Sequence, residues 1–132
     1  MANALYPKWK EALVQASANS ALTGTVKVAL IDTGTYTYSA THQFFSDLSG
    51  VVGTPQAIGT HTYTNGTFDA ADATFTAVTG ASVEALVLYI DTGTTTTSRL
   101  VGYLDTGQTG LPVTPNGGDI TITWNASGIF TL

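Results

Sequence analysis

The first periodic pattern along the chain is helical. The apolar residues Trp9, Leu13 and Ala16 recur at intervals of three or four positions, and charged or polar residues occupy the other face. Pro7 suits the first turn of a helix, because the N–H that proline lacks would have no partner there. This pattern predicts one amphipathic helix over about residues 7–17.

After Gly24 the pattern changes to that of β-strands. Residues 26–31 are apolar on both faces, which is typical of a covered, central strand. Further short strands are expected within residues 83–90, 99–104 and 120–124, with turn residues between them. The sequence therefore predicts a mainly β fold, an antiparallel β-sandwich or barrel of the jelly-roll-like type, with one N-terminal helix. We expect a single domain over residues 1–132, with the β-rich body at about 24–132.

Low charge limits the classes of partner. Charged residues make up 10% of the chain and the formal net charge is −5, whereas an average domain has about 25% charged residues. The four basic residues cannot build a patch that neutralises phosphates, so we expect no nucleic-acid partner. No apolar run approaches the ~20 residues of a membrane span, so we expect no membrane partner. The basic residues are Lys8, Lys10, Lys27 and Arg99.

The triplet Asp-Thr-Gly occurs three times, each time after an apolar run. An aspartic protease carries its catalytic carboxylate in such a setting, where two aspartates share one proton. Three copies in a short chain fit neither form of that enzyme, and a turn explains them more simply. Asp accepts local backbone N–H groups, and Gly adopts the positive φ of a turn. We therefore expect no catalytic residues and six turn-forming ones: Asp32, Gly34, Asp91, Gly93, Asp105 and Gly107.

Other chemistry is weakly represented, so we expect no cofactor and no metal. His42 and His61 lack the spacing of a zinc site. The segments 69–72 and 116–119 have too few ligands for a calcium loop. A carbohydrate-binding face is an alternative, because several aromatic residues could line one, although their strand periodicity favours the core. These are Tyr36, Tyr38, Tyr63, Tyr89, Tyr103 and Trp124.

The chain as a whole resembles a family of small structural proteins encoded by tailed bacteriophages. The resemblance covers nearly the full length and concerns residues that carry the fold. It is found in the segments Tyr6–Lys8, Thr25–Asp32, Phe45–Gly50, Ala85–Tyr89, Gly110–Val113, Asn116–Trp124 and Ile129–Phe130.

This resemblance implies a non-enzymatic component of the virion, assembled in the host cytoplasm. The role we expect is a capsid decoration or cement protein, which binds the outer surface of the major capsid protein and copies of itself. The N-terminal helix is the expected contact element, through Tyr6, Trp9 and Leu13. Two alternatives stay open: a tail, neck or fibre-attachment protein of the virion, and a carbohydrate-binding module for adsorption.

Overall fold

A computed structural model describes residues 3–132. These residues form one α-helix, two short 3-10 helices and nine strands. In chain order the elements are β1 (Ala4–Leu5), α1 (Pro7–Val14), β2 (Val26–Ile31), η1 (Phe45–Asp47), β3 (Val51–Ala57), η2 (Thr64–Gly66), β4 (Thr67–Phe68), β5 (Ala73–Phe75), β6 (Ala85–Ile90), β7 (Arg99–Leu104), β8 (Ile120–Ile122) and β9 (Phe130–Thr131).

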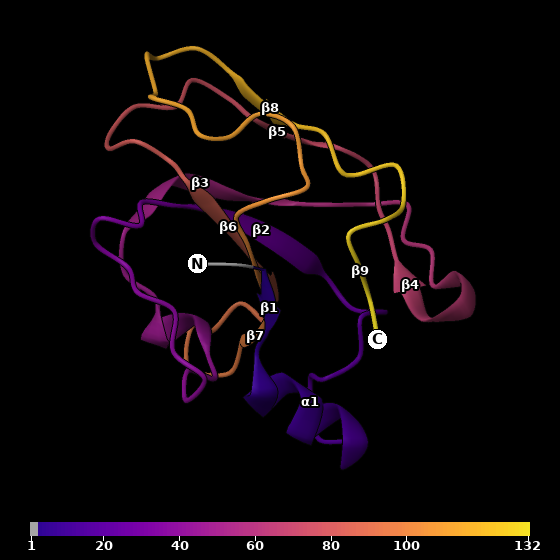
Figure 1. The fold of residues 1–132 in the computed structure, drawn as a ribbon. Helices are drawn as coiled ribbons and strands as arrows, with labels where there is room; N and C mark the ends of the chain where they lie inside the picture. Colours follow the sequence, from indigo (N-terminus) through magenta and orange to yellow (C-terminus); the bar gives the residue numbers. More distant parts are fainter. Residues whose placement is uncertain (1–2) are drawn as a thin grey trace.

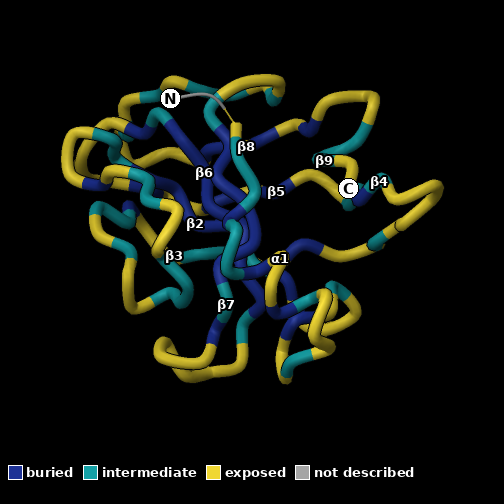
Figure 2. Tube along the Cα trace, turned by 60° about the horizontal axis from the view of Figure 1, so that its bottom comes forward, coloured by how far each residue is buried: buried dark blue, intermediate teal, exposed yellow. Residues whose placement is uncertain are grey.

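Five strands form a central antiparallel sheet in the order β1-β7-β6-β2-β3. In its middle, β2 pairs with β6, so that Val26 lies opposite Ile90 and Ile31 opposite Ala85. Every residue of β6 is buried, and so is every residue of β2 except Lys27. Strands that are buried on both faces read as continuous apolar runs, and this explains the pattern of both segments. Figure 2 shows these strands as the buried centre of the molecule.

One face of the sheet is covered by two small antiparallel ribbons, β4 with β9 and β5 with β8 (Figure 1). Their inward side chains are apolar: Phe68 is 2%, Phe75 1% and Ile122 0% exposed. We call this side of the sheet the ribbon face. It is held mainly by the burial of large apolar side chains.

The opposite face is covered by residues 32–50, which contain η1 but no strand. The ring of Phe45 lies 4.7 Å from that of Tyr89, and the ring of Tyr38 lies 5.7 Å from that of Tyr103. A hydrogen bond of 2.8 Å from the Asp32 N–H to the Gly50 carbonyl joins the two ends of the segment. We call this side the loop face.

The N-terminal segment contacts both faces. Tyr6, just before α1, packs its ring 5.0 Å from that of Tyr38 on the loop face. Trp9, in the first turn of α1, lies edge-on to Phe130 of β9, with the ring centres 5.7 Å apart. The helix therefore connects the two coverings at one end of the sheet.

The helix is shorter than the sequence predicts, since α1 ends at Val14 and not at residue 17. Ala16 has a φ of 52°, in the left-handed region, and this turns the chain away from the helix axis. The Ser17 N–H then donates to the Ala12 carbonyl at 2.8 Å, which is the 6→1 bond of a Schellman ending.

The predicted fold class is confirmed: the protein is mainly β and antiparallel, with one short N-terminal helix. The strands of residues 3–132 form one five-stranded sheet and two small two-stranded sheets, and not a closed barrel. Within residues 3–132 the central sheet is open, with β1 and β3 as its edge strands. None of the helices in this range is long and apolar enough to cross a membrane.

Candidate functional site

The three Asp-Thr-Gly triplets follow β2, β6 and β7. Two of them form turns through their own aspartate, because Asp32 Oδ1 accepts the Gly34 N–H at 2.9 Å and Asp91 Oδ1 accepts the Gly93 N–H at 3.1 Å. The expected positive φ occurs at Gly93 (85°) and Gly107 (89°). Gly34 does not adopt one, because its turn continues with the N–H groups of the next two residues donating to the Asp32 carbonyl.

The third triplet depends on a residue far away in the sequence. Asn3 Oδ1 accepts the backbone N–H groups of Asp105 at 2.6 Å and of Thr106 at 3.0 Å. The Asn3 amide nitrogen in turn donates to the Thr106 carbonyl at 2.9 Å. The turn after β7 is thereby fixed to the segment that precedes β1.

The sheet separates the three aspartates. Asp91 lies at one end of the sheet and the other two at the opposite end, because β6 runs antiparallel to β2 and β7. Asp32 and Asp105 follow strands separated by β6, about 10 Å apart at normal strand spacing. Both oxygens of Asp32 are already bound within its own turn, by Gly34 and by the Thr35 hydroxyl. This arrangement differs from a dyad in which two carboxylates about 3 Å apart share a proton.

Asp91 forms an ion pair with Lys27, whose Nζ lies 2.9 Å from Asp91 Oδ2. The hydrogen bond from Lys27, aided by the Gly93 N–H, holds the pKa of Asp91 below its usual range. A second ion pair joins Lys8 to Glu11 on the exposed side of α1, at 3.0 Å.

The candidate metal residues also have local roles. Asp69 Oδ1 accepts the Ala70 N–H, and Asp119 Oδ1 accepts the Ala77 N–H at 3.0 Å. His61 Nε2 lies 2.7 Å from the Ile58 carbonyl oxygen. Among residues 3–132, no three His, Asp or Glu side chains are grouped closely enough to hold a metal ion.

Two of the three expected contact residues lie inside the core. Tyr6 is 0% and Trp9 1% exposed, and Leu13 is half-buried. The Trp9 indole N–H donates to the Ser20 carbonyl at 2.8 Å, so the ring is fixed from both sides. A partner that binds the folded chain does not reach Tyr6 or Trp9. The amphipathic face that the sequence shows is covered by the protein's own sheet, whereas Val14 at the end of α1 is 87% exposed.

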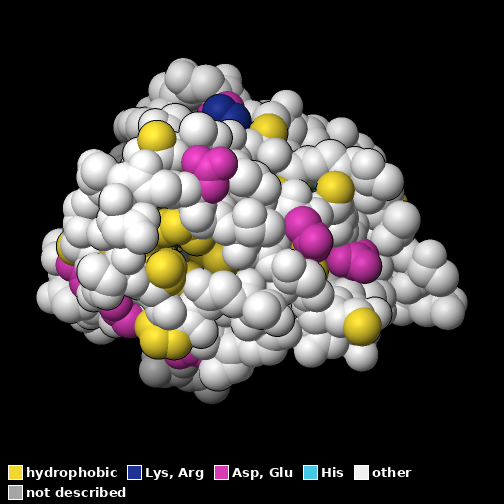
Figure 3. All heavy atoms as spheres, turned by 90° about the horizontal axis from the view of Figure 1, so that it is seen from above, with side chains coloured by type: hydrophobic (Ala, Val, Ile, Leu, Met, Phe, Trp, Pro, Cys, Tyr) yellow, Lys and Arg dark blue, Asp and Glu magenta, His cyan; other side chains and the backbone are white. Residues whose placement is uncertain are grey.

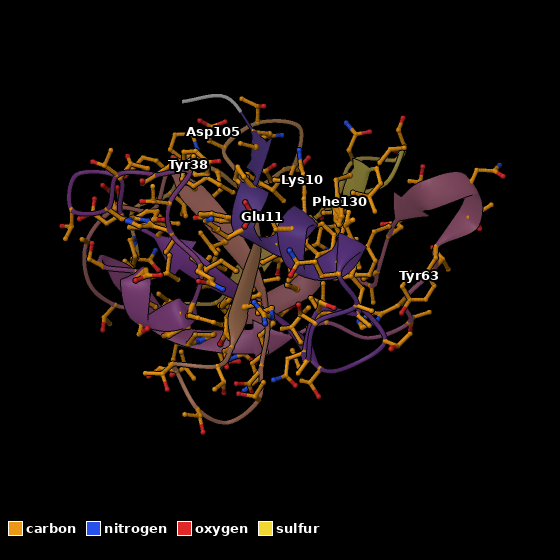
Figure 4. The ribbon with its side chains drawn as sticks, turned by 90° about the horizontal axis from the view of Figure 1, so that it is seen from below. Lys10, Glu11, Tyr38, Tyr63, Asp105 and Phe130 are labelled. Atoms are coloured by element: carbon orange, nitrogen blue, oxygen red, sulfur yellow. The ribbon has the colours of Figure 1, made fainter. Side chains whose placement is uncertain are left out.

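The hollow with the most varied chemistry lies where β2 and β7 end and β6 begins, and its volume is about 420 Å³. We call it the tyrosine hollow. Figure 4 shows two of its residues, Tyr38 and Asp105, at the same end of the molecule, while Tyr63 lies on the other side. Its walls are Thr33, Tyr36, Thr37, Tyr38, Glu84, Tyr103, Asp105, Thr106 and Pro112.

Hydrogen bonds beneath the hollow position its aromatic walls. The hydroxyls of Tyr6 and Tyr36 are 2.8 Å apart, and the Tyr36 hydroxyl lies 2.7 Å from His42 Nδ1. Burial raises the pKa of Tyr6, Tyr36 and Tyr38 above the usual value for a phenol. The pKa of Tyr103 is raised by burial first, and then by the negative charges of Asp105 and Glu84.

Comparison with known proteins adds no identity. The sequence matches none of the protein-family models, and no curated protein is significantly similar to it. The chemistry of the chain therefore has to be inferred from its own residues.

The sequence patterns do not reveal the tyrosine hollow, although they mark three of its aromatic residues as candidates for a binding face. Tyr36 and Tyr38 come from the segment after β2, Tyr103 from β7, and Glu84 from the residue before β6. One signal was available, since Glu84 is the only charged residue within the apolar segment 83–90. A single carboxylate at the start of a buried strand indicates that one end of that strand is polar.

Proposed function

We propose that this protein is a non-enzymatic structural subunit of a tailed-bacteriophage particle. Its role is to bind the outer surface of the major capsid protein and to stabilise the head. The resemblance to phage structural proteins supports the assignment to a phage particle. It includes residues of the central sheet, since Thr25–Asp32 covers β2 and Ala85–Tyr89 covers most of β6.

The observation that carries an assembly role is the character of the surface. Figure 3 shows a face on which uncharged polar and backbone atoms predominate, with scattered acidic groups, little basic surface and an apolar hollow. With charged residues at only 10% of the chain, contacts with neighbours depend little on long-range electrostatics and therefore little on salt. A cement subunit works by binding the assembled lattice more tightly than the free capsid subunit.

Exposed apolar residues indicate where such a contact would form. The large exposed hydrophobic side chains of the described residues are Val14 (87%), Tyr63 (45%) and Leu132 (62%). Tyr63 and Leu132 flank the paired strands β4 and β9, and α1, which ends at Val14, contacts β9 through Trp9. The contact surface on this proposal is the exposed end of α1 with its neighbours, and not the buried face of the helix.

Location and copy number in purified particles test the proposal. A head role requires hundreds of copies on the outer capsid surface in a cryo-EM reconstruction. Six or twelve copies at the neck or baseplate would contradict the head assignment while keeping the virion role. If the protein is absent from the particle and binds specifically on a glycan array, the head and virion roles are both contradicted. The carbohydrate-binding role in adsorption would then be supported.

A pair of variants tests the contact surface. Val14→Lys should reduce incorporation into particles at least tenfold, because it places a charge in an apolar contact. Thr114→Lys, in the exposed segment before β8, is the matched control and should incorporate normally. Equal incorporation of the two variants would show that the end of α1 is not the contact element.

A further inference from the structure

A second property of the molecule concerns the tyrosine hollow. The walls of this hollow include three tyrosines, two carboxylates and three threonine side chains. None of the four basic residues of the chain is among its walls. The hollow therefore combines aromatic surface with negative charge.

Tyr103 contributes a hydroxyl that is available to a ligand in the hollow. Its side chain is 3% exposed, and its ring packs against Tyr36 and Tyr38, with centres 6.5 and 5.7 Å away. Its hydroxyl makes no hydrogen bond with any residue in the described range 3–132. The hydroxyl oxygen is not completely enclosed, so it can receive a hydrogen bond from a ligand that enters the hollow.

Glu84 is held in a fixed orientation at the same place. Its Oε1 accepts two hydrogen bonds of 3.0 Å, from the backbone N–H and the hydroxyl of Thr33. The carboxylate therefore needs little reorganisation to receive a ligand. Burial first, and then the charges of Asp105 and Glu84, raise the pKa of the Tyr103 phenol, as expected for a phenol close to two carboxylates.

We propose that the tyrosine hollow binds a basic side chain, arginine or lysine, presented by a partner protein. The Glu84 carboxylate would accept charge-assisted hydrogen bonds from the cation. The aromatic walls would contact the aliphatic stem and the cationic head. The phenol oxygen of Tyr103 would accept one of the remaining N–H groups. This binding follows from the charge and walls of the hollow and does not depend on the partner being a capsid protein.

The test uses the whole protein with N-acetyl-arginine amide and N-acetyl-lysine amide as probes. N-acetyl-glutamine amide serves as the uncharged control, and methyl glucoside represents a neutral sugar. Binding is followed through the ring NMR signals of Tyr38 and Tyr103. At least one basic probe should shift these signals and bind with an affinity about tenfold higher than that of the glutamine probe. Added salt should weaken the binding of the basic probe.

Two variants locate the binding. Glu84→Gln removes the charge but keeps an oxygen acceptor for Thr33, and should weaken the basic probe about tenfold. Glu11→Gln on α1 removes the same charge elsewhere and should leave binding unchanged. Tyr103→Phe keeps the ring and removes the unpaired hydroxyl; it should fold normally and bind less tightly. If Glu84→Gln does not fold, the binding affinity of Tyr103→Phe tests the proposal instead.

Three outcomes would overturn the proposal. The first is equal binding of the arginine, lysine and glutamine probes, or no binding of any of them. The second is a shift of the tyrosine signals by methyl glucoside but not by the basic probes, which would make the hollow a sugar site. The third is unchanged binding of the basic probe by folded Glu84→Gln and Tyr103→Phe proteins.

Discussion

The two faces of the central sheet are covered in different ways. The ribbon face is closed by Phe68, Phe75 and Ile122, which bury apolar surface and have no polar atoms to satisfy. The loop face is closed by an irregular segment whose tyrosines are joined by hydrogen bonds, with Tyr36 bonded to both Tyr6 and His42. The same strands serve both, because neighbouring residues of a strand point to opposite faces.

The difference shows how each face responds to change. Apolar packing loses stability in proportion to the volume removed. A buried polar network is sensitive to the loss of a single atom, since the remaining partners keep their desolvation cost. The following predictions separate these two behaviours, beginning with the largest expected effect.

Removing a ring from the ribbon face should cost most. Phe75→Ala should lower the free energy of unfolding by about 3–5 kcal/mol, because it leaves a cavity under β5 and β8. Urea denaturation measures this loss. The control is Thr74→Ala on the exposed side of the same strand, which should stay within about 0.5 kcal/mol of the unmodified protein. A loss below about 1 kcal/mol for Phe75→Ala would mean that the ribbons contribute little to the core.

Removing one oxygen atom from the loop face should lower the stability less than Phe75→Ala does, but far more than the volume of that atom explains. Tyr36→Phe keeps the ring and should lower stability by about 1–3 kcal/mol, because the buried Tyr6 hydroxyl loses its partner. Tyr38→Phe is the control, since the Tyr38 hydroxyl makes no hydrogen bond within residues 3–132. If the two variants are equally stable, the hydroxyl chain does not hold this face.

Acid should weaken the loop face. Two carboxylates there have a lowered pKa: Asp47, which accepts the N–H groups of Phe44 and Gln43, and Asp91, which is paired with Lys27. A carboxylate whose pKa is lowered by folding stabilises the folded protein at pH values above its unfolded pKa of about 3.9. This contribution disappears as the pH falls through the pKa of the folded state.

Lys27→Met tests this directly. The variant should be about 1 kcal/mol less stable at pH 7, and the difference should shrink as the pH falls below about 4. Thermal unfolding between pH 2 and pH 7 gives both numbers. A difference that stays constant over this range would show that the ion pair does not cause the acid sensitivity.

The smallest effect concerns the connection between the faces. Ala16 has a left-handed φ of 52°, which costs an alanine about 1–2 kcal/mol of strain. Glycine would remove this strain, but its greater freedom in the unfolded chain would lower the stability by about 0.4–1 kcal/mol. Ala16→Gly should therefore stabilise the protein by about 0.5 kcal/mol, measured by urea denaturation. If α1 couples the two faces, hydrogen exchange should slow on both. Slowing on one face alone would show that they open independently.

The middle of the fold could be predicted from the sequence, because burial on both faces leaves a clear apolar run. The predicted strand at residues 99–104 has the bounds of β7, and residues 26–31 those of β2. The edges could not be predicted. Strand β3 contains Gly53 and Pro55, which break the pattern, and β1 has only two residues. The pair Asn65-Gly66 is typical of a hairpin turn, but within residues 3–132 its two arms are joined only by the bridge between Thr62 and Asp69, while β4 pairs with β9.

The candidate sites were harder to predict for a different reason. A helical stripe containing Trp9 shows that one side of the helix must be covered, but not whether the cover is the protein's own sheet or a partner. The tyrosine hollow joins residues of three distant segments, and only the pairing of β2, β6 and β7 brings Tyr38, Glu84 and Tyr103 together. Its parts were visible in the sequence, but their proximity was not.

The pairing of β1 with β7 affects the order in which the protein can be completed. During synthesis Ala4 and Leu5 leave the ribosome long before their partners Tyr103 and Gly102 exist. Asn3 likewise waits for the turn that it fixes after β7. Pairings between such distant segments form slowly, because a long loop must close first. Residues 3–5 are thus among the last to reach their final place, and their pairing with β7 completes the central sheet.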